Sequence, residues 1–140
     1  MTERMLTGSC LCGALKYRVS GDDAFGYRWP VPYLDARRAI RTVRAKAGEW
    51  NIDPAKVGVM GSSAGGHLAS VCATRFEDRF DEETSDAIDG ESCRPEFAIL
   101  VYPVISMQKP ITHEGSQRRL LGAEPAGEMI ESLSTERAVT

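Results

Sequence analysis

Five residues near the middle of the chain could form a turn that presents a reactive serine. Residues 61–65 read Gly-Ser-Ser-Ala-Gly and fit the pattern G-x-S-x-G, in which the nucleophile is the central residue, Ser63. A serine in this position lies at the start of a helix, where the backbone N–H of Ala64 can face a developing oxyanion. The pattern predicts acyl transfer through an acyl-enzyme. The alternative is a glycine-rich strand–helix turn without chemistry.

The sequence around this turn provides the elements that must position it. Residues 57–60 form a short apolar run, which predicts a buried strand, and residues 64–74 are small and alanine-rich, which predicts a helix. Residues 97–102 predict a second buried strand, ended by Pro103. Strand, helix and strand in this order form a βαβ unit, so we expect two parallel strands joined by a right-handed crossover. The fold class is therefore α/β.

The glycines of the turn are expected to be steric requirements. A strand-to-helix turn of this kind is so tight that its neighbouring side chains must be small. This predicts that Gly61 and Gly65 cannot carry a larger side chain, and that Gly66 gives further room.

Both histidines of the chain are candidates for a catalytic base, and the sequence separates them. His67 follows Ser63 by four residues, so on a helix it lies about one turn away, whereas a triad base faces the serine from a separate loop. His67 is thus expected to be structural. His113 follows the second strand in a loop and is the alternative, a makeshift base. Asp35 is expected to serve its helix.

Residues 27–140 resemble the central part of an α/β-hydrolase of the esterase and acetylxylan-esterase-like group. The stretches that carry the resemblance are residues 27–32, 34–41, 52–69, 98–107 and 112–116, with the serine motif in the third. The resemblance implies a partial doubly wound parallel sheet. It also implies that Ser63 attacks ester carbonyls, including those of acetylated sugars.

The same resemblance indicates which catalytic parts to look for elsewhere. In the family the acid and the histidine of the triad follow the serine along the chain. They lie well downstream, and this sequence ends at Thr140 before reaching them. An upstream HGGG-type oxyanion loop is not found either. We therefore expect a truncated serine ester hydrolase that is weakly active or inactive.

The N-terminal residues 7–21 resemble the start of the glutathione-dependent formaldehyde-activating enzyme family, a zinc-binding β fold. Their motif is C-x-C-G followed by alternating apolar and polar residues, and the resemblance would make Cys10 and Cys12 zinc ligands. A structural zinc site usually needs a second close pair, and Cys72 and Cys93 are far apart in sequence. A complete site is therefore not expected.

Two families thus meet near residue 26. We expect a β segment over residues 1–26, as a strand or hairpin, and a truncated hydrolase-like domain over residues 27–140. Two alternatives to the ester hydrolase stay open. One is a non-catalytic fragment or fusion product, and the other is a zinc-dependent enzyme that acts on a glutathione adduct.

The rest of the chain predicts positioning elements. Residues 33–50 have the period of an amphipathic helix, residues 77–96 are acidic and read as an exposed mobile loop, residues 106–124 look irregular, and residues 128–133 can form a short helix. Four arginines lie mainly off the apolar stripe of the first helix and are expected on a solvated face, with a phosphate partner as the alternative: Arg37, Arg38, Arg41 and Arg44.

Composition limits the classes of function. The chain has 140 residues, 42% hydrophobic and 26% charged, which suits one soluble globular domain. A net charge of −3 argues against nucleic acid as a partner. The longest apolar run, residues 97–105, is too short to span a membrane, and the first residues lack an apolar signal core, so a cytoplasmic location is expected. We expect a small-molecule ester as substrate, no cofactor, and an option of homo-oligomerisation through open sheet edges.

Overall fold

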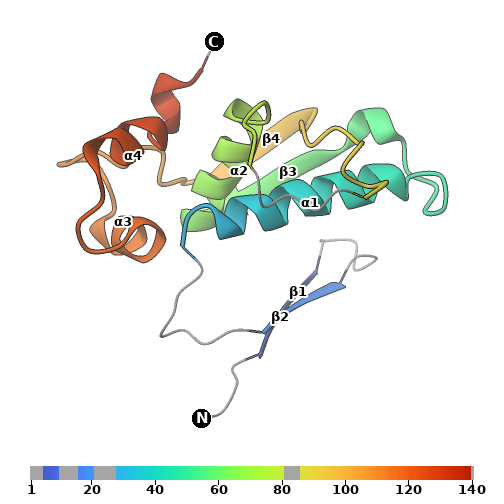
Figure 1. The fold of residues 1–140 in the computed structure, drawn as a ribbon, viewed down its shortest axis with the longest axis horizontal. Coiled ribbons are helices and arrows are strands. Elements are labelled where there is room, and N and C mark those ends of the chain that lie inside the picture. The colour runs from blue at the N-terminus through green and yellow to red at the C-terminus, as the bar shows by residue number, and fades with distance from the viewer. Residues whose placement is uncertain (1–4, 10–15, 21–27, 81–85, 140) are drawn as a thin grey trace.

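The computed structural model describes the backbone of residues 5–9 and 16–20, and the backbone and side chains of residues 28–80 and 86–139 (Figure 1). The strands are β1 (Met5–Ser9), β2 (Lys16–Ser20), β3 (Gly58–Ser62) and β4 (Phe97–Val101). The α-helices are α1 (Val31–Ala45), α2 (Ala64–Thr74), α3 (Glu114–Leu121) and α4 (Gly127–Ser132), and short 3₁₀ turns cover Pro54–Lys56 and Thr135–Arg137. No helix in the described ranges has the length and apolarity that a membrane crossing requires.

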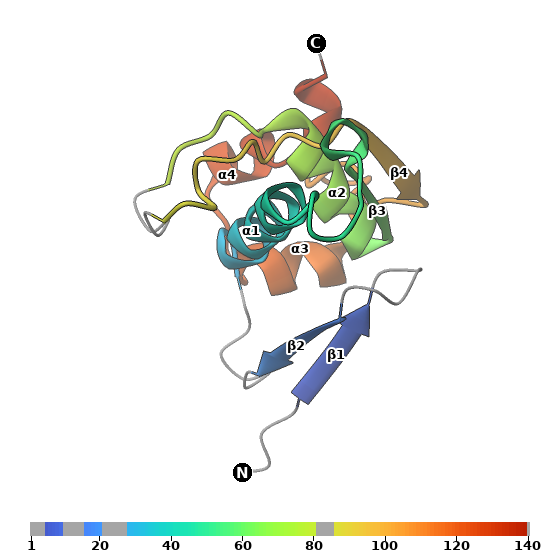
Figure 2. The same cartoon turned by 90° about the vertical axis from the view of Figure 1, so that its right-hand side faces the viewer.

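Strands β3 and β4 form the parallel pair that the sequence predicts. They are paired in register from Gly58 opposite Phe97 to Ser62 opposite Val101. Figure 2 shows α2 between this pair and α1, so helices and strands form successive layers. The α/β class is confirmed, and the helix predicted over residues 64–74 is found at those residues.

The core lies where α1 and α2 meet the C-terminal part of the chain. Its buried members come from both helices, from the residue before β3 and from the segments around α3 and α4: Tyr33, Ile40, Val57, Val71, Cys72, Met107 and Leu133. Tyr33 and Leu133 have no exposed surface. The C-terminal segments are thus integral to the packing of α2, the helix that follows the serine motif.

The face of the sheet turned away from α2 is apolar and open. Met60, Phe97 and Ile99 share this face and are 53%, 52% and 48% exposed. A Cβ built on Gly58 would lie 2.4 Å from the Phe97 ring, so the ring occupies the space beside this glycine. The two faces of the same strands therefore differ in how well they are covered. The prediction of two buried strands is wrong, because every residue of β3 and β4 is half-buried or exposed.

The expectation of a solvated arginine face on α1 is wrong for two of its residues. Arg37 and Arg41 are only 2% and 6% exposed. Arg37 donates to the backbone carbonyl of Asp78 at 2.6 Å. Arg41 donates to the carbonyl of Glu91 and lies 3.5 Å from the carboxylate of Asp89. The physical reason is that these guanidinium groups satisfy carbonyls of the acidic segment.

The acidic segment is accordingly folded back onto α1. Arg38 forms ion pairs with Asp86 and Asp89, and Arg44 pairs with Glu96 at 3.0 Å. The prediction of an exposed loop is confirmed for most of residues 86–96, and the structure adds that this loop is tied to the helix at several points. The arginines of α1 therefore have partners within this segment of the chain.

The structure corrects the predicted bounds of one helix and adds a helix in a segment that was predicted to be irregular. Helix α1 begins two residues earlier than the predicted 33–50, because Pro32 is tolerated in a first turn, and it ends at Ala45 before a series of turns. Residues 106–124 are not irregular throughout, because α3 forms there. The short predicted helix over 128–133 is confirmed as α4.

The N-terminal segment contains a hairpin. Strands β1 and β2 pair antiparallel, with Met5 opposite Ser20 and Ser9 opposite Lys16. A β strand or hairpin is thus confirmed there. Cys10 and Cys12 lie outside the described residues.

Candidate active site

Ser63 lies in the turn between β3 and α2, as the motif predicts. The strand ends at Ser62 and the helix begins at Ala64. The Ser63 backbone has φ 52° and ψ −119°, a conformation with positive φ that L-residues other than glycine rarely adopt. A backbone of this kind costs free energy and persists only where its surroundings enforce it. The geometry is that of a nucleophile elbow, with an exposed serine at its tip.

Three backbone hydrogen bonds hold Ser63 in this conformation. Its N–H donates to the carbonyl of Val101 at 3.0 Å, and its own carbonyl accepts from the N–H groups of His67 and Val104 at 3.1 Å each. The serine is thereby fixed to the end of β4, to the first turn of α2 and to the segment after β4. These contacts come from three parts of the chain, so the strained turn is overdetermined.

The space around the turn explains two of its three glycines. A Cβ on Gly61 would lie 2.0 Å from the carbonyl oxygen of Gly65, and a Cβ on Gly66 would lie 2.9 Å from Cβ of Pro103. Both positions therefore exclude a side chain. The expectation is wrong for Gly65, where an added Cβ meets nothing within 4 Å. Gly65 matters through its carbonyl, which lies against Gly61.

The N-terminus of α2 is free to face a negative charge. This helix has no side-chain cap, and no acidic residue occupies its first turn. Its first N–H groups, beginning with Ala64, lack partners within the helix, and the helix dipole places partial positive charge there. An oxyanion that forms beside Ser63 would therefore find donors in place, which is half of an oxyanion hole.

His67 has a structural role in the protein interior. The residue is 3% exposed, and its Nε2 donates to the carbonyl of Leu133 at 2.8 Å. Burial lowers the pKa of this histidine, which keeps the ring neutral. The bond ties α2 to the segment after α4.

His113 caps a helix that the sequence did not predict. It precedes α3, and its Nδ1 accepts from the N–H of Ser116 at 3.2 Å and lies 2.9 Å from the Ser116 hydroxyl. The makeshift-base candidate thus has a local partner. The Ser63 hydroxyl has no hydrogen-bond partner in the part of the chain that the structure describes, so neither histidine is bonded to it.

The two cysteines of the described core, which could serve as nucleophiles or metal ligands, are both buried. Cys72 and Cys93 are free and buried, and burial raises the pKa of Cys72 to about 12. A thiol with this pKa stays protonated and is a poor nucleophile or metal ligand. Within the described ranges, no three His, Cys, Asp or Glu side chains are grouped as metal ligands. The predicted role of Cys10 and Cys12 falls outside these ranges.

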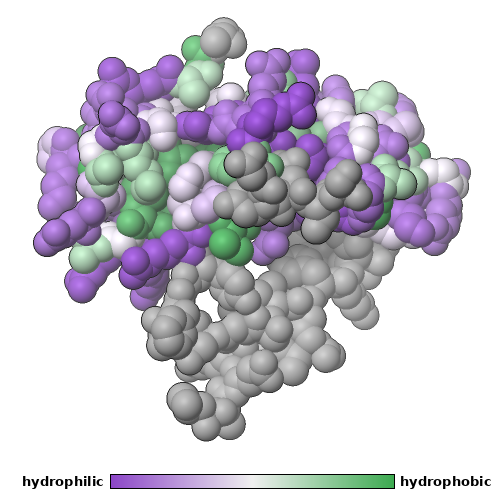
Figure 3. Space-filling model, viewed as in Figure 1, coloured by the Kyte–Doolittle hydropathy of each residue, from purple (hydrophilic) through white to green (hydrophobic). Residues whose placement is uncertain are grey.

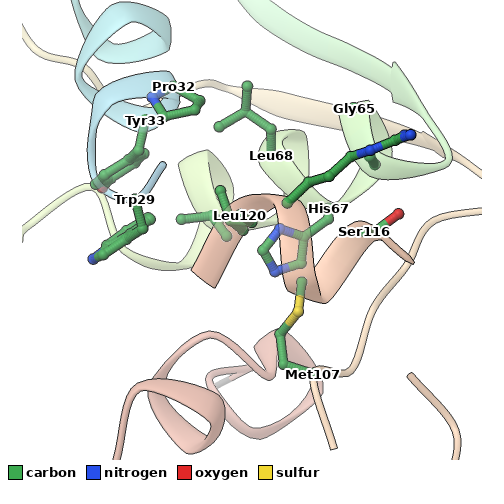
Figure 4. Close-up of a pocket in the computed structure, with 12 residues that line it drawn as sticks. Trp29, Pro32, Tyr33, Gly65, His67, Leu68, Met107, Ser116 and Leu120 are labelled. Carbon is green, nitrogen blue, oxygen red and sulfur yellow. The ribbon is translucent and has the colours of Figure 1, made fainter. Parts of the chain in front are cut away.

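A cavity of about 320 Å³ lies beside the N-terminus of α2 (Figure 4). Its walls come from the start of α1, from α2, from Met107 and from α3, and they are Trp29, Pro32, Tyr33, Ala64, Gly65, His67, Leu68, Val71, Met107, Ser116, Arg119 and Leu120. Sequence reasoning missed this cavity because α3, which supplies three of its residues, was expected to be irregular. The available signal was the leucine pair Leu120 and Leu121 with polar residues before it.

The fold and the elbow together define an α/β-hydrolase segment. A parallel strand, a strained serine turn, a small-residue helix and a second parallel strand occur in the order and geometry of that class. More particularly, the chain belongs to the BD-FAE family, whose model matches residues 3–136. The match includes residues 7–21, and the separate resemblance of that segment to a zinc family stays a prediction.

Several known proteins are similar to this chain. The structure of an acetyl ester-xyloside bifunctional hydrolase from Caldicellulosiruptor lactoaceticus matches 81% of the chain with 46% identity and a TM-score of 0.74. An acetylxylan esterase of Xylanibacter ruminicola is 39% identical over 120 residues, or 81% of the chain. An endo-1,4-beta-xylanase B of Butyrivibrio fibrisolvens is 41% identical over 109 residues, or 77% of the chain.

The match covers only part of each of these proteins. The chain spans 41% of the solved bifunctional hydrolase, 22% of the acetylxylan esterase and 16% of the xylanase. The similarity therefore covers the elbow and its surrounding elements, and the activities of the whole relatives are not assigned to this chain by it.

Proposed function

We propose that this chain is the nucleophile-bearing segment of a serine carboxylic ester hydrolase. The observation that carries the proposal is the strained Ser63 backbone, held by hydrogen bonds to β4 and α2. In the proposed reaction Ser63 Oγ attacks the ester carbonyl and the alcohol leaves, which gives an acyl-enzyme that water then hydrolyses. The Ala64 N–H stabilises the oxyanion in both steps.

The proposed substrate class is a small-molecule carboxylic ester, and acetylated sugars are one example of this class. Two similar proteins are described as an acetylxylan esterase and an acetyl ester-xyloside bifunctional hydrolase, and both are similar over the elbow. A short acyl group is compatible with an exposed serine, because the attacked carbonyl then reaches Ser63 without a deep channel.

Turnover by this chain alone is expected to be weak. The Ser63 hydroxyl has no base among the described residues, and a serine without its base remains a neutral alcohol of high pKa. The loss of one oxyanion-hole donor lowers the catalytic rate by a further factor of about 10²–10³. The specific observation that favours the second candidate, a non-catalytic segment, is this same unpartnered hydroxyl.

Hydrolysis of 4-nitrophenyl acetate tests the proposal. The wild type is compared with Ser63→Ala and with Ser62→Ala, a matched change one residue away on the strand. The proposal expects slow turnover that is lost in Ser63→Ala and kept in Ser62→Ala. Turnover that survives Ser63→Ala would remove Ser63 as the nucleophile. Rapid turnover that depends on Ser63 would show that a base is recruited from the chain or a second subunit.

A further inference from the structure

The cavity beside α2 has apolar walls and one unused charged group. Most of its lining side chains are apolar, with two aromatic rings, Trp29 and Tyr33, among them. Its polar members are His67, Ser116 and Arg119. His67 is bonded to a backbone carbonyl and Ser116 to His113, whereas in the described part of the chain the Arg119 guanidinium makes no hydrogen bond or ion pair. Arg119 is an exposed residue of the cavity wall, so it brings a solvent-accessible positive charge to the edge of an apolar cavity.

The cavity is adjacent to the proposed reaction site. Ala64 and Gly65, the two residues that follow Ser63, form part of its wall. Figure 4 shows Gly65 and Ser116 toward one end of the cavity and Trp29 and Tyr33 toward the other. Its volume suits a small organic group. One part of an ester whose carbonyl lies at Ser63 can therefore enter it.

The charges around the cavity favour an anion. No carboxylate belongs to its lining. Arg118 precedes Arg119, and Arg28 lies close to the end of α3, because a Cβ on Gly122 would be 3.1 Å from its guanidinium. The acid at the start of α3, Glu114, is paired with Lys109 at 3.0 Å. Figure 3 shows an apolar area on the left of this face, where Figure 1 has α3 and α4. Hydrophilic side chains border this apolar area.

Arg118 and Arg119 both complement the dipole of α3, so a substitution of Arg118 is a matched control for the same substitution of Arg119. Both lie in the last turn of α3, where a positive charge complements the helix dipole. Only Arg119 belongs to the lining of the cavity. An effect that is confined to Arg119 therefore reports on the cavity and not on the helix.

We propose that this cavity binds a carboxylate-bearing apolar group of the ester substrate, with the Arg119 guanidinium pairing with the carboxylate. The group belongs to the acyl side or the alcohol side of the ester. A planar guanidinium pairs well with a carboxylate, and the apolar walls take the hydrocarbon part. This inference rests on the proposed function, since it places the group next to Ser63.

Pairs of anionic and neutral esters test the proposal. They also show whether the carboxylate-bearing group belongs to the acyl side or to the alcohol side of the ester. For the acyl side, 4-nitrophenyl hydrogen glutarate is compared with 4-nitrophenyl butyrate. For the alcohol side, 4-acetoxybenzoate is compared with its neutral methyl ester. Arg119→Gln should lower the anionic-to-neutral ratio of kcat/KM about three- to tenfold for one pair, while Arg118→Gln changes it less than about twofold. An unchanged ratio for both pairs, or an equal loss in Arg118→Gln, would overturn the proposal.

A binding measurement is independent of turnover. The chain has two tryptophans, so in a Trp50→Phe background the fluorescence comes from Trp29, which lines the cavity. Titration with 4-hydroxybenzoate should quench it, and Arg119→Gln should weaken that binding by at least about threefold without affecting methyl 4-hydroxybenzoate. Quenching that is absent or insensitive to Arg119→Gln would overturn the proposal. Arg119-dependent binding without any ester hydrolysis would support the cavity assignment and count against the proposed function.

Discussion

Helices α1 and α2 are neighbours, yet they are fixed in place by different interactions. Helix α2 has no Asp, Glu, Lys or Arg and is positioned by close packing of small residues against β3 and the Pro103 segment. Helix α1 carries four arginines, two of them buried, that bind carbonyls and carboxylates of the acidic segment. The comparison shows that the serine turn combines backbone hydrogen bonds with a close steric fit, whereas α1 combines apolar core contacts with charged contacts to the acidic segment.

The largest effect is expected from Gly61→Val, which breaks the steric fit of α2. The new Cβ would occupy a position 2.0 Å from the Gly65 carbonyl oxygen, which is backbone and cannot move aside. We expect a loss of more than about 4 kcal/mol in the free energy of unfolding, or no folding, in urea denaturation.

Gly65→Ala is the matched control for this change. Its Cβ meets nothing within 4 Å, and alanine is a better helix residue than glycine. Unfolding should therefore need the same or slightly more urea. A Gly61→Val protein as stable as Gly65→Ala would contradict the steric account of the elbow.

A smaller effect is expected from Arg41→Met, which breaks a polar contact of α1. The variant leaves the carbonyl of Glu91 without its donor and removes the ion pair with Asp89. We expect a loss of about 1–3 kcal/mol in the free energy of unfolding, measured in urea. Arg38→Met is the control, because Arg38 is 36% exposed and its ion pairs are screened by solvent. Equal losses in both variants would argue against the importance of burial at Arg41.

The smallest effect concerns the pH dependence contributed by His67. Burial lowers its pKa in the folded protein, so below the unfolded pKa of about 6.5 the unfolded chain takes up the proton first. The stability contribution of the neutral ring is complete above that pH and is lost as the pH falls. Urea midpoints from about pH 8 to about pH 5 should decline less in His67→Gln than in the wild type. The same decline in both proteins would contradict this account.

The comparison of the two helices also explains what sequence reasoning could predict. The βαβ unit and the elbow depend on local patterns, namely apolar runs at residues 57–60 and 97–102 and the glycines between Ser62 and His67, and both were predicted. The burial of Arg37 and Arg41 depends on carbonyls 41 and 50 residues further along the chain, which no periodicity reveals.

The cavity and α3 were missed for a related reason. The helix contains only eight residues, and its cap is a histidine, which is not among the usual capping residues. The walls of the cavity then come from segments far apart in sequence, such as Trp29 and Arg119. A site of this kind becomes visible only when the segments are folded together.

The central claim is that Ser63 is the nucleophile, and covalent labelling tests it most directly. A fluorophosphonate reacts with a nucleophilic serine by forming an oxygen–phosphorus bond as fluoride leaves, and mass spectrometry of the digested protein locates the adduct. We expect slow modification confined to Ser63, which is lost in Ser63→Ala and retained in Ser62→Ala. An adduct on a different serine, or equal labelling of Ser63→Ala, would contradict the account.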